Sequence, residues 1–288
     1  MIEIIEETLI DSIKLLPFLF ITYLIMEYIE HKMGEKSKKT IQKSGKWGPF
    51  FGSILGIFPQ CGFSVSATNL YAGRVITLGT LIAVYLSTSD EMLPIFISEA
   101  VSPIIILKIL GIKLIIGMIA GFIIDVVIHM FRKNKKDDLE EIEIEHVCKE
   151  EHCHCDEKGI LKSSVKHTIS IFIYIVIITF IINIIVHLVG EDTIASWILN
   201  KPILGPVISA LIGLIPNCAA SVVLTNLYLE NVISVGSMIA GLLTGAGVGL
   251  MVLFKTNHDW KENLKIVGLL YLIGIISGVV LQLLNIAF

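Results

Sequence analysis

Charged side chains are scarce in this chain of 288 residues, because Asp, Glu, Lys and Arg together make up only 17% of it. Soluble domains usually carry roughly 25%. The sequence has no Gly-x-x-x-x-Gly-Lys-Ser/Thr phosphate loop, which excludes direct coupling to ATP through that motif. A net charge of −4 disfavours a nucleic-acid partner, and no nucleophile has a convergent base. We therefore expect neither nucleic-acid binding nor an enzymatic activity.

Cysteine is also rare, and its distribution excludes the disulfide framework of a small secreted protein. Two of the five cysteines, Cys61 and Cys218, lie within apolar segments, and the other three crowd into one short polar segment. This pattern is typical of a chain whose thiols face a reducing cytoplasm.

Long apolar runs, by contrast, are abundant. Hydrophobic residues make up 54% of the chain, and its mean hydropathy is +0.81. The run from Thr168 to Val189 contains no Lys, Arg, Asp or Glu and is long enough to cross a bilayer as a helix, which takes about 20 residues. The sequence therefore predicts an all-α polytopic membrane protein, with the lipid bilayer as its first partner.

An internal repeat is the strongest feature of the sequence. Segment 56–71 recurs as 213–228 with nine of sixteen positions identical, including Pro-x-Cys-x-x-Ser and Thr-Asn-Leu-Tyr. Matching glycines and lysines at the same offset of 157 extend the repeat to about 48–129 and 205–286. The chain thus contains two copies of one unit.

Lysines predict which segments face the cytoplasm. Segment 31–46 carries six lysines and segment 131–166 is basic at both ends, so we expect both on the cytoplasmic side. An even number of crossings must then separate them. This holds if 75–98 and 103–130 cross, while 48–73 breaks at its proline and returns as a re-entrant hairpin.

Each half then has three spanning helices and one broken hairpin, and three crossings turn the second half upside down. We divide the chain into a first transmembrane repeat (1–130), a cytoplasmic linker rich in Cys and His (131–166) and a second transmembrane repeat (167–288). Lys108 and Lys113 fit poorly, because this arrangement puts both at or near the outer face. An alternative with additional short spans stays open. Inverted repeats with broken helices are a recurring design of secondary transporters.

The two hairpin tips are the candidate substrate site. A half-helix is expected to start at or just after each Cys, so that its N–H groups favour negative charge or a thiolate. Alternatively, the small residues only allow close packing. The repeated Asn either bridges helices or lines the path. A carboxylate inside 75–98 is a cation ligand or proton carrier, unless that span ends early. The candidate substrate-binding residues are Gln60, Cys61, Ser64, Asn69, Asp90, Asn217, Cys218, Ser221 and Asn226.

The linker carries the clearest metal signal. Six Cys and His side chains fall within ten residues, beside several carboxylates, and their spacing matches no ordered zinc finger. We therefore expect transient metal capture and no tightly bound cofactor; the alternative is a merely polar linker. The expected metal ligands are His146, Cys148, His152, Cys153, His154 and Cys155.

The duplicated motifs, the stretch 87–91 (Ser-Thr-Ser-Asp-Glu) and the Cys/His-rich linker resemble a family of ten-segment heavy-metal exporters. These are prokaryotic inner-membrane proteins described as arsenic-efflux-like or as manganese transporters. The resemblance covers most of the chain, and counting each hairpin as two segments gives ten. It implies export of a metal or metalloid. From the resemblance together with the repeat and the candidate sites, we expect secondary export of a heavy-metal ion, Mn or a thiophilic divalent metal, across the inner (plasma) membrane. Efflux of arsenite, an organoarsenical or a sulfur oxyanion, a non-transporting metal sensor, and homo-oligomerisation stay open.

Overall fold

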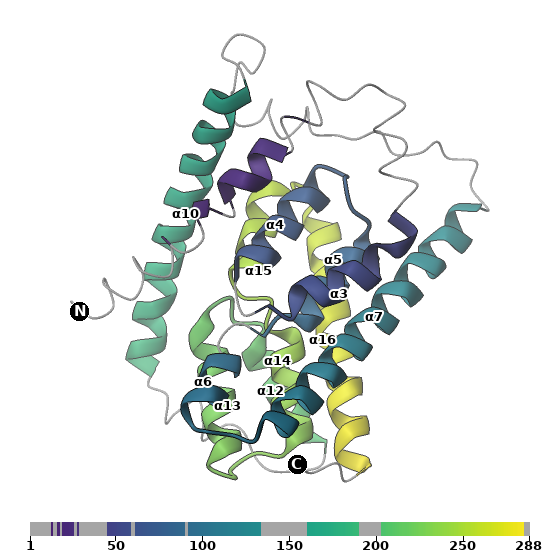
Figure 1. The fold of residues 1–288 in the computed structure, drawn as a ribbon, viewed down its shortest axis with the longest axis vertical. Helices are drawn as coiled ribbons and strands as arrows, with labels where there is room; N and C mark the ends of the chain where they lie inside the picture. Colours follow the sequence, from purple (N-terminus) through teal and green to yellow (C-terminus); the bar gives the residue numbers. More distant parts are fainter. Residues whose placement is uncertain are drawn as a thin grey trace.

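Every secondary-structure element in the described part of the chain is a helix, as the hydropathy predicts (Figure 1). The computed structural model describes residues 45–58, 61–89, 92–133, 160–189 and 203–284, together with helical residues between 13 and 28. After a 3₁₀ turn at Gly45–Trp47, the helices are α3 (Gly48–Gly56), α4 (Cys61–Ala72), α5 (Leu78–Ser87), α6 (Met92–Ser98), α7 (Pro103–Lys133), α10 (Ile160–Val189), α12 (Leu204–Gly213), α13 (Cys218–Leu229), α14 (Val235–Thr244), α15 (Val248–Thr256) and α16 (Trp260–Leu283).

Five helical stretches in the described residues are long and apolar enough to cross a membrane. They are Leu78–Ser98, Pro103–Phe131, Ser164–Ile181, Val235–Thr256 and Trp260–Leu283. Two of them consist of two half-helices each, α5 with α6 and α14 with α15. The helices α3, α4, α12 and α13 have 9 to 12 residues. A helix of that length measures less than about 20 Å, which is too short to cross the bilayer core alone.

The outer helices expose apolar side chains and bury their polar contacts, as a lipid environment requires. On α10, every fourth residue from Ile169 to Ile181 is an isoleucine, and these side chains are 46 to 53% exposed. Ile171 and Ile175, on the other face of α10, are buried. Residues four apart lie on one helix face, so α10 presents a continuous isoleucine ridge to lipid.

Within each half of the chain, two helices pack closely through glycines at equivalent positions. A Cβ atom added to Gly79 of α5 would lie 2.2 Å from the Gly121 carbonyl oxygen of α7. A Cβ atom added to Gly236 of α14 would lie 2.5 Å from the Gly278 carbonyl oxygen of α16. Small residues at such crossings let helix backbones approach closely in membranes. The sequence repeat is therefore also a repeat of helix packing.

Helices α5 and α14 also begin in the same way. The hydroxyl of Thr77 accepts a hydrogen bond from the Thr80 N–H (3.1 Å), and that of Ser234 accepts one from the Ser237 N–H (3.2 Å). The first half adds a carboxylate: Asp125 of α7 accepts bonds from the Gly79 N–H and the Thr77 hydroxyl. These acceptors satisfy N–H groups that a helix start leaves without partners.

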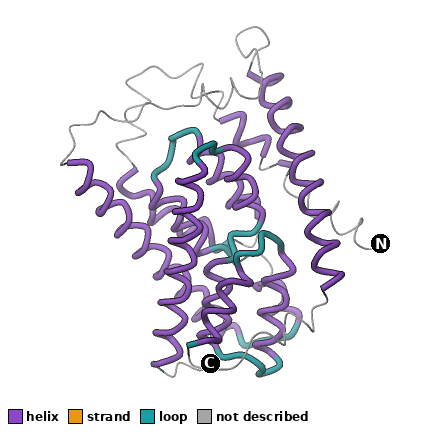
Figure 2. Tube along the Cα trace, turned by 180° about the vertical axis from the view of Figure 1, so that it is seen from behind, coloured by secondary structure: helices purple, strands orange, loops and turns teal. Residues whose placement is uncertain are grey.

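The halves interlock across the middle of the molecule. We call the pairs of short helices α3–α4 and α12–α13 hairpins. Helix α4 packs against α15, and α13 packs against α6, so that each hairpin contacts a half-helix of the other half. In Figure 1, α3 and α4 lie in the upper part and α12 and α13 in the lower part, while α7 and α16 run in opposite directions. Figure 2 shows non-helical segments at mid-height as well as at the ends.

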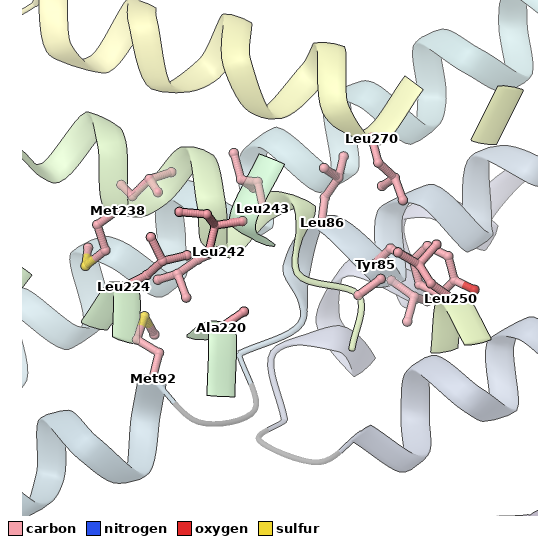
Figure 3. Packing of buried hydrophobic residues seen from close by; sticks show 14 of the residues in the cluster. Tyr85, Leu86, Met92, Ala220, Leu224, Met238, Leu242, Leu243, Leu250 and Leu270 are labelled. Atoms are coloured by element: carbon pink, nitrogen blue, oxygen red, sulfur yellow. The ribbon is translucent and has the colours of Figure 1, made fainter. Parts of the chain in front are cut away.

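One buried hydrophobic cluster joins both halves (Figure 3). It includes Leu86 of α5, Met92 of α6, Leu224 of α13, Leu242 of α14 and Leu270 of α16. A shared core of this kind fixes the four half-helices α5, α6, α14 and α15 relative to the hairpin helix α13.

Candidate substrate site

Both hairpins break where the repeated motif predicts. Helix α3 ends at Gly56 and α4 begins at Cys61, while α12 ends at Gly213 and α13 begins at Cys218. At the first tip, the Ser64 hydroxyl donates to the Cys61 carbonyl oxygen (2.8 Å). The first-turn N–H groups of α4 and α13 give each tip a partial positive charge.

A second pair of breaks was not predicted. The sequence indicates one helix over 75–98, but α5 stops at Ser87 and α6 starts only at Met92. The other half breaks between α14 and α15, where Gly247 has φ 54° and ψ −139°. Only glycine adopts that conformation readily. Ser87, Thr88 and Ser89 are all buried at the first break. The described part of the polar stretch, 87–89, therefore lies where one candidate span is interrupted.

The serines of the two hairpin tips both lie against the α14–α15 break. A Cβ atom added to Gly249 would lie 3.1 Å from the Ser64 hydroxyl oxygen, and one added to Gly245 would lie 3.4 Å from the Ser221 hydroxyl oxygen. Ser64 and Ser221, which occupy equivalent positions of the repeat, thus lie against the same short segment although they belong to different halves of the chain.

The carbonyl oxygen of Gly249 is the centre of a buried hydroxyl cluster. The hydroxyls of Thr68 and Tyr85 both lie 3.2 Å from it, and the Thr68 hydroxyl also lies 2.7 Å from the Ser64 carbonyl oxygen. The two hydroxyls also lie within bonding distance of each other, so their two protons are shared among these contacts. Because Thr68 belongs to α4, Tyr85 to α5 and Gly249 to α15, the cluster joins the hairpin to the half-helix packed against it.

Lys113 of α7 is fully buried beside these breaks. Its ammonium donates to the carbonyl oxygen of Thr88 and to that of Leu242 (3.1 Å for the second). The side chain of Lys113 points into the protein, and the prediction that Lys113 lies at or near the outer face stays a prediction. Lys108, one and a half turns earlier, is exposed. Sequence reasoning missed Lys113 as a site residue, although a lysine within an apolar span is itself a functional signal.

The two repeated asparagines have different surroundings. Asn69 is buried, and its side-chain oxygen accepts a hydrogen bond from the Tyr23 hydroxyl (3.3 Å). Tyr23 in turn stacks on His167 of α10, with ring centroids 5.3 Å apart. Asn226 is exposed. Asn69 therefore bridges helices, which is one of the two roles predicted for it.

One end of the molecule carries an ion pair. The guanidinium of Arg74, after α4, donates two hydrogen bonds to the Glu262 carboxylate of α16 (3.1 and 3.2 Å). The hydroxyl of Tyr71 and the amide of Asn257 donate to the same carboxylate. This cluster links the first half to the second at the end where α16 begins.

Several predicted site residues lie outside the described part. These are Gln60, Asp90 and the six linker ligands between His146 and Cys155, and the side chain of Cys218 is not described either. Asn217 is buried at the second tip, and Cys61 is half-buried at the first. Among the described residues, no three His, Cys, Asp or Glu side chains are grouped to hold a metal ion. The linker site therefore stays a prediction.

Comparison with known proteins agrees with this architecture. A family model with the description "Putative, 10TM heavy-metal exporter" matches residues 1–189 and 163–287, nearly the whole chain. No curated protein and no solved structure matches the chain. Together with the apolar helices, the match shows that this multi-pass membrane protein belongs to the family of ten-transmembrane-segment heavy-metal exporters.

Proposed function

We propose that the protein is a secondary active transporter that exports a heavy-metal ion, Mn or a thiophilic divalent metal, across the prokaryotic inner membrane. In this proposal the two halves (1–130 and 167–288) are inverted-topology repeats, each with three spanning helices and one re-entrant hairpin. The opposite directions of α7 and α16 support the inversion, as do the opposite ends at which the hairpins lie (Figure 1).

The observation that carries the proposal is the meeting of hairpin tips with interrupted spans. Ser64 and Ser221 contact the α14–α15 break, and the α5–α6 break presents buried polar residues nearby. Secondary transporters bind substrate where discontinuous helices expose backbone groups inside the membrane. Such irregular backbone is tolerated at that depth only where protein or a water-filled path covers it.

The donor types at this centre favour a hard or borderline cation. Carbonyl and hydroxyl oxygens come from Thr88, Ser64 and Ser221, and the chain continues from Ser89 into Asp90. Oxygen donors suit Mn, while the thiols of Cys61 and Cys218 would extend the range to thiophilic metals.

The direction of transport is proposed from the linker. Residues 131–166 are basic at both ends, which favours the cytoplasmic side. The six Cys and His ligands in it would then collect metal on the side that the metal leaves. From there the ion would pass the hairpin tips and meet Asp90.

Purified protein in sealed vesicles tests this proposal. Flux of Mn, Zn and Cd should be saturable in the wild type, and the double variant Ser64→Ala/Ser221→Ala should lower it at least tenfold. Ser98→Ala is the matched control, because Ser98 is exposed on α6 and bonds only locally.

Two other outcomes would replace the proposal. Competition of arsenite or thiosulfate with flux, without competition by divalent metals, would favour efflux of arsenite or a sulfur oxyanion. An absence of any flux, with metal still bound by the linker, would favour a membrane metal sensor.

A further inference from the structure

The ammonium of Lys113 occupies a position built from two helix ends. Thr88 is the C-cap of α5, and Leu242 lies in the last turn of α14. Their carbonyl oxygens both accept from the Lys113 ammonium. The last four carbonyls of a helix have no intrahelical partner, and the helix dipole makes that end negative. The two half-helices therefore create a cation-binding position inside the protein.

A lysine is not required at residue 113 for packing. The residue 157 places after Lys113 is Leu270 of α16, which is also fully buried. The same place in the repeated packing thus accepts an apolar side chain in one half and an ammonium in the other. Burial of an ammonium is costly unless strong partners offset it. A purely structural role would be met by leucine at lower cost, so the charge calls for another explanation.

Among the described residues on the helices packed against Lys113, ionisable side chains are few. The helices packed against α7 in this region are α3, α5 and α14. Among them, Tyr85 of α5 is the one titratable side chain, and its hydroxyl bonds to Gly249 and Thr68. Asp90 and Glu91 follow Ser89 in the sequence and lie outside the described residues. In the described part, the cation-binding character comes from backbone carbonyls.

We propose that the C-terminal ends of α5 and α14 form a cation site, that Lys113 is its built-in occupant, and that the exported cation competes with the Lys113 ammonium for it. The competition rests on the proposed function, whereas the existence of the cation site does not. A tethered ammonium would keep the site filled after the metal leaves, without need of a second soluble cation such as Na⁺. Half-helix C-termini and unwound carbonyls coordinate coupling cations in other secondary transporters.

The site itself is tested without any transport measurement. Lys113→Ala leaves room at the two carbonyls, so methylammonium should raise the thermal unfolding temperature of this variant by a few degrees in a saturable way. Tetramethylammonium, which has the charge but no N–H donor, should not. The wild type should respond to neither. Absence of a methylammonium effect on folded Lys113→Ala would overturn the cation site.

The competition is tested by metal binding to purified full-length protein. Lys113→Leu carries the residue found at the equivalent position of the other half. If the ammonium fills the wild-type site about nine-tenths of the time or more, this variant should bind Mn or Cd at least about tenfold more tightly than the wild type. Lys108→Leu, an exposed charge removed from the same helix, should bind like the wild type. Equal affinities of Lys113→Leu and the wild type would overturn the competition.

Two polar variants allow the test to be made if Lys113→Ala and Lys113→Leu do not fold. Lys113→Gln keeps N–H donors without charge, and Lys113→Arg keeps both. If the apolar variants do not fold, Gln should tighten metal binding and Arg should not, and equal affinities would again overturn the competition. A wild type that moves no metal in vesicles would refute the proposed export, while the methylammonium result would still decide the site.

Discussion

Replacing glycines of α7 and α16 by alanine should lower the free energy of unfolding at some positions and raise it at others on the same helices. Gly121 is crowded: an added Cβ would lie 2.5 Å from the Gly79 carbonyl oxygen and 2.8 Å from Pro49 Cβ. Gly278 is crowded in the equivalent way, 2.6 Å from the Gly236 carbonyl oxygen. Overpacking typically costs about 1–3 kcal/mol. Gly121→Ala and Gly278→Ala should each lower the free energy of unfolding by that amount.

Gly111 and Gly268 are the matched controls. They lie on the same two helices and are also 157 residues apart, but an added Cβ would meet nothing within 4 Å. Replacing a helical glycine by alanine where space allows gains about 0.5–1 kcal/mol. Gly111→Ala and Gly268→Ala should therefore be stabilising, which separates the two classes by about 1.5–4 kcal/mol. Reversible unfolding in mixed micelles measures this difference. Shifts of the same sign and size in all four variants would refute the close helix packing described above.

Three further predictions concern the site and its surroundings. Tyr85→Phe and Thr68→Val should each cost about 0.5–1.5 kcal/mol of unfolding free energy, and the double variant should cost less than the sum because either single variant already removes the bond between the two hydroxyls; strict additivity would contradict this. Glu262→Gln should lower the free energy of unfolding by about 1–3 kcal/mol, since the carboxylate is only about one-quarter exposed and accepts hydrogen bonds from Arg74, Tyr71 and Asn257. It should also alter vesicle flux, and unchanged flux would argue that the contact does not control opening. Ser at all three linker cysteines (Cys148, Cys153 and Cys155) should weaken Zn binding by the linker, whereas flux at saturating metal should persist. Unchanged Zn affinity by calorimetry would show that these thiols are not ligands.

The hairpin breaks were predictable because their cause is local. A proline and neighbouring glycine or alanine interrupt each hairpin, and the duplication of Pro-x-Cys-x-x-Ser marks the interruption twice. The α5–α6 break also has a proline nearby, Pro94 in the first turn of α6, but no second copy of the motif marks it. Its polar stretch could equally mark the end of a span, and the matching Gly-Ala-Gly of the other half is apolar in composition. Hydropathy alone does not distinguish these cases.

Lys113 and Asn69 show what the sequence could not supply. A lysine predicts a membrane face by the charge rule, but the partners of Lys113 are backbone carbonyls, which no residue pattern records. Asn69 and Asn226 occupy identical motifs, yet one is buried and the other exposed. Asn69 bonds to Tyr23, which belongs to a first segment whose sequence agrees poorly with its counterpart.

The Arg74–Glu262 pair joins the halves at one end of the molecule, and its counterpart positions hold Asn231 and Ile105, which cannot form an ion pair. A transporter with matched halves would open toward either compartment at equal free energy. Even about 1 kcal/mol at one end alone makes one orientation roughly fivefold more populated at rest. The resting direction of such a protein would then be set by a single half-buried ion pair, and loss of either residue would remove the preference while leaving the binding centre untouched.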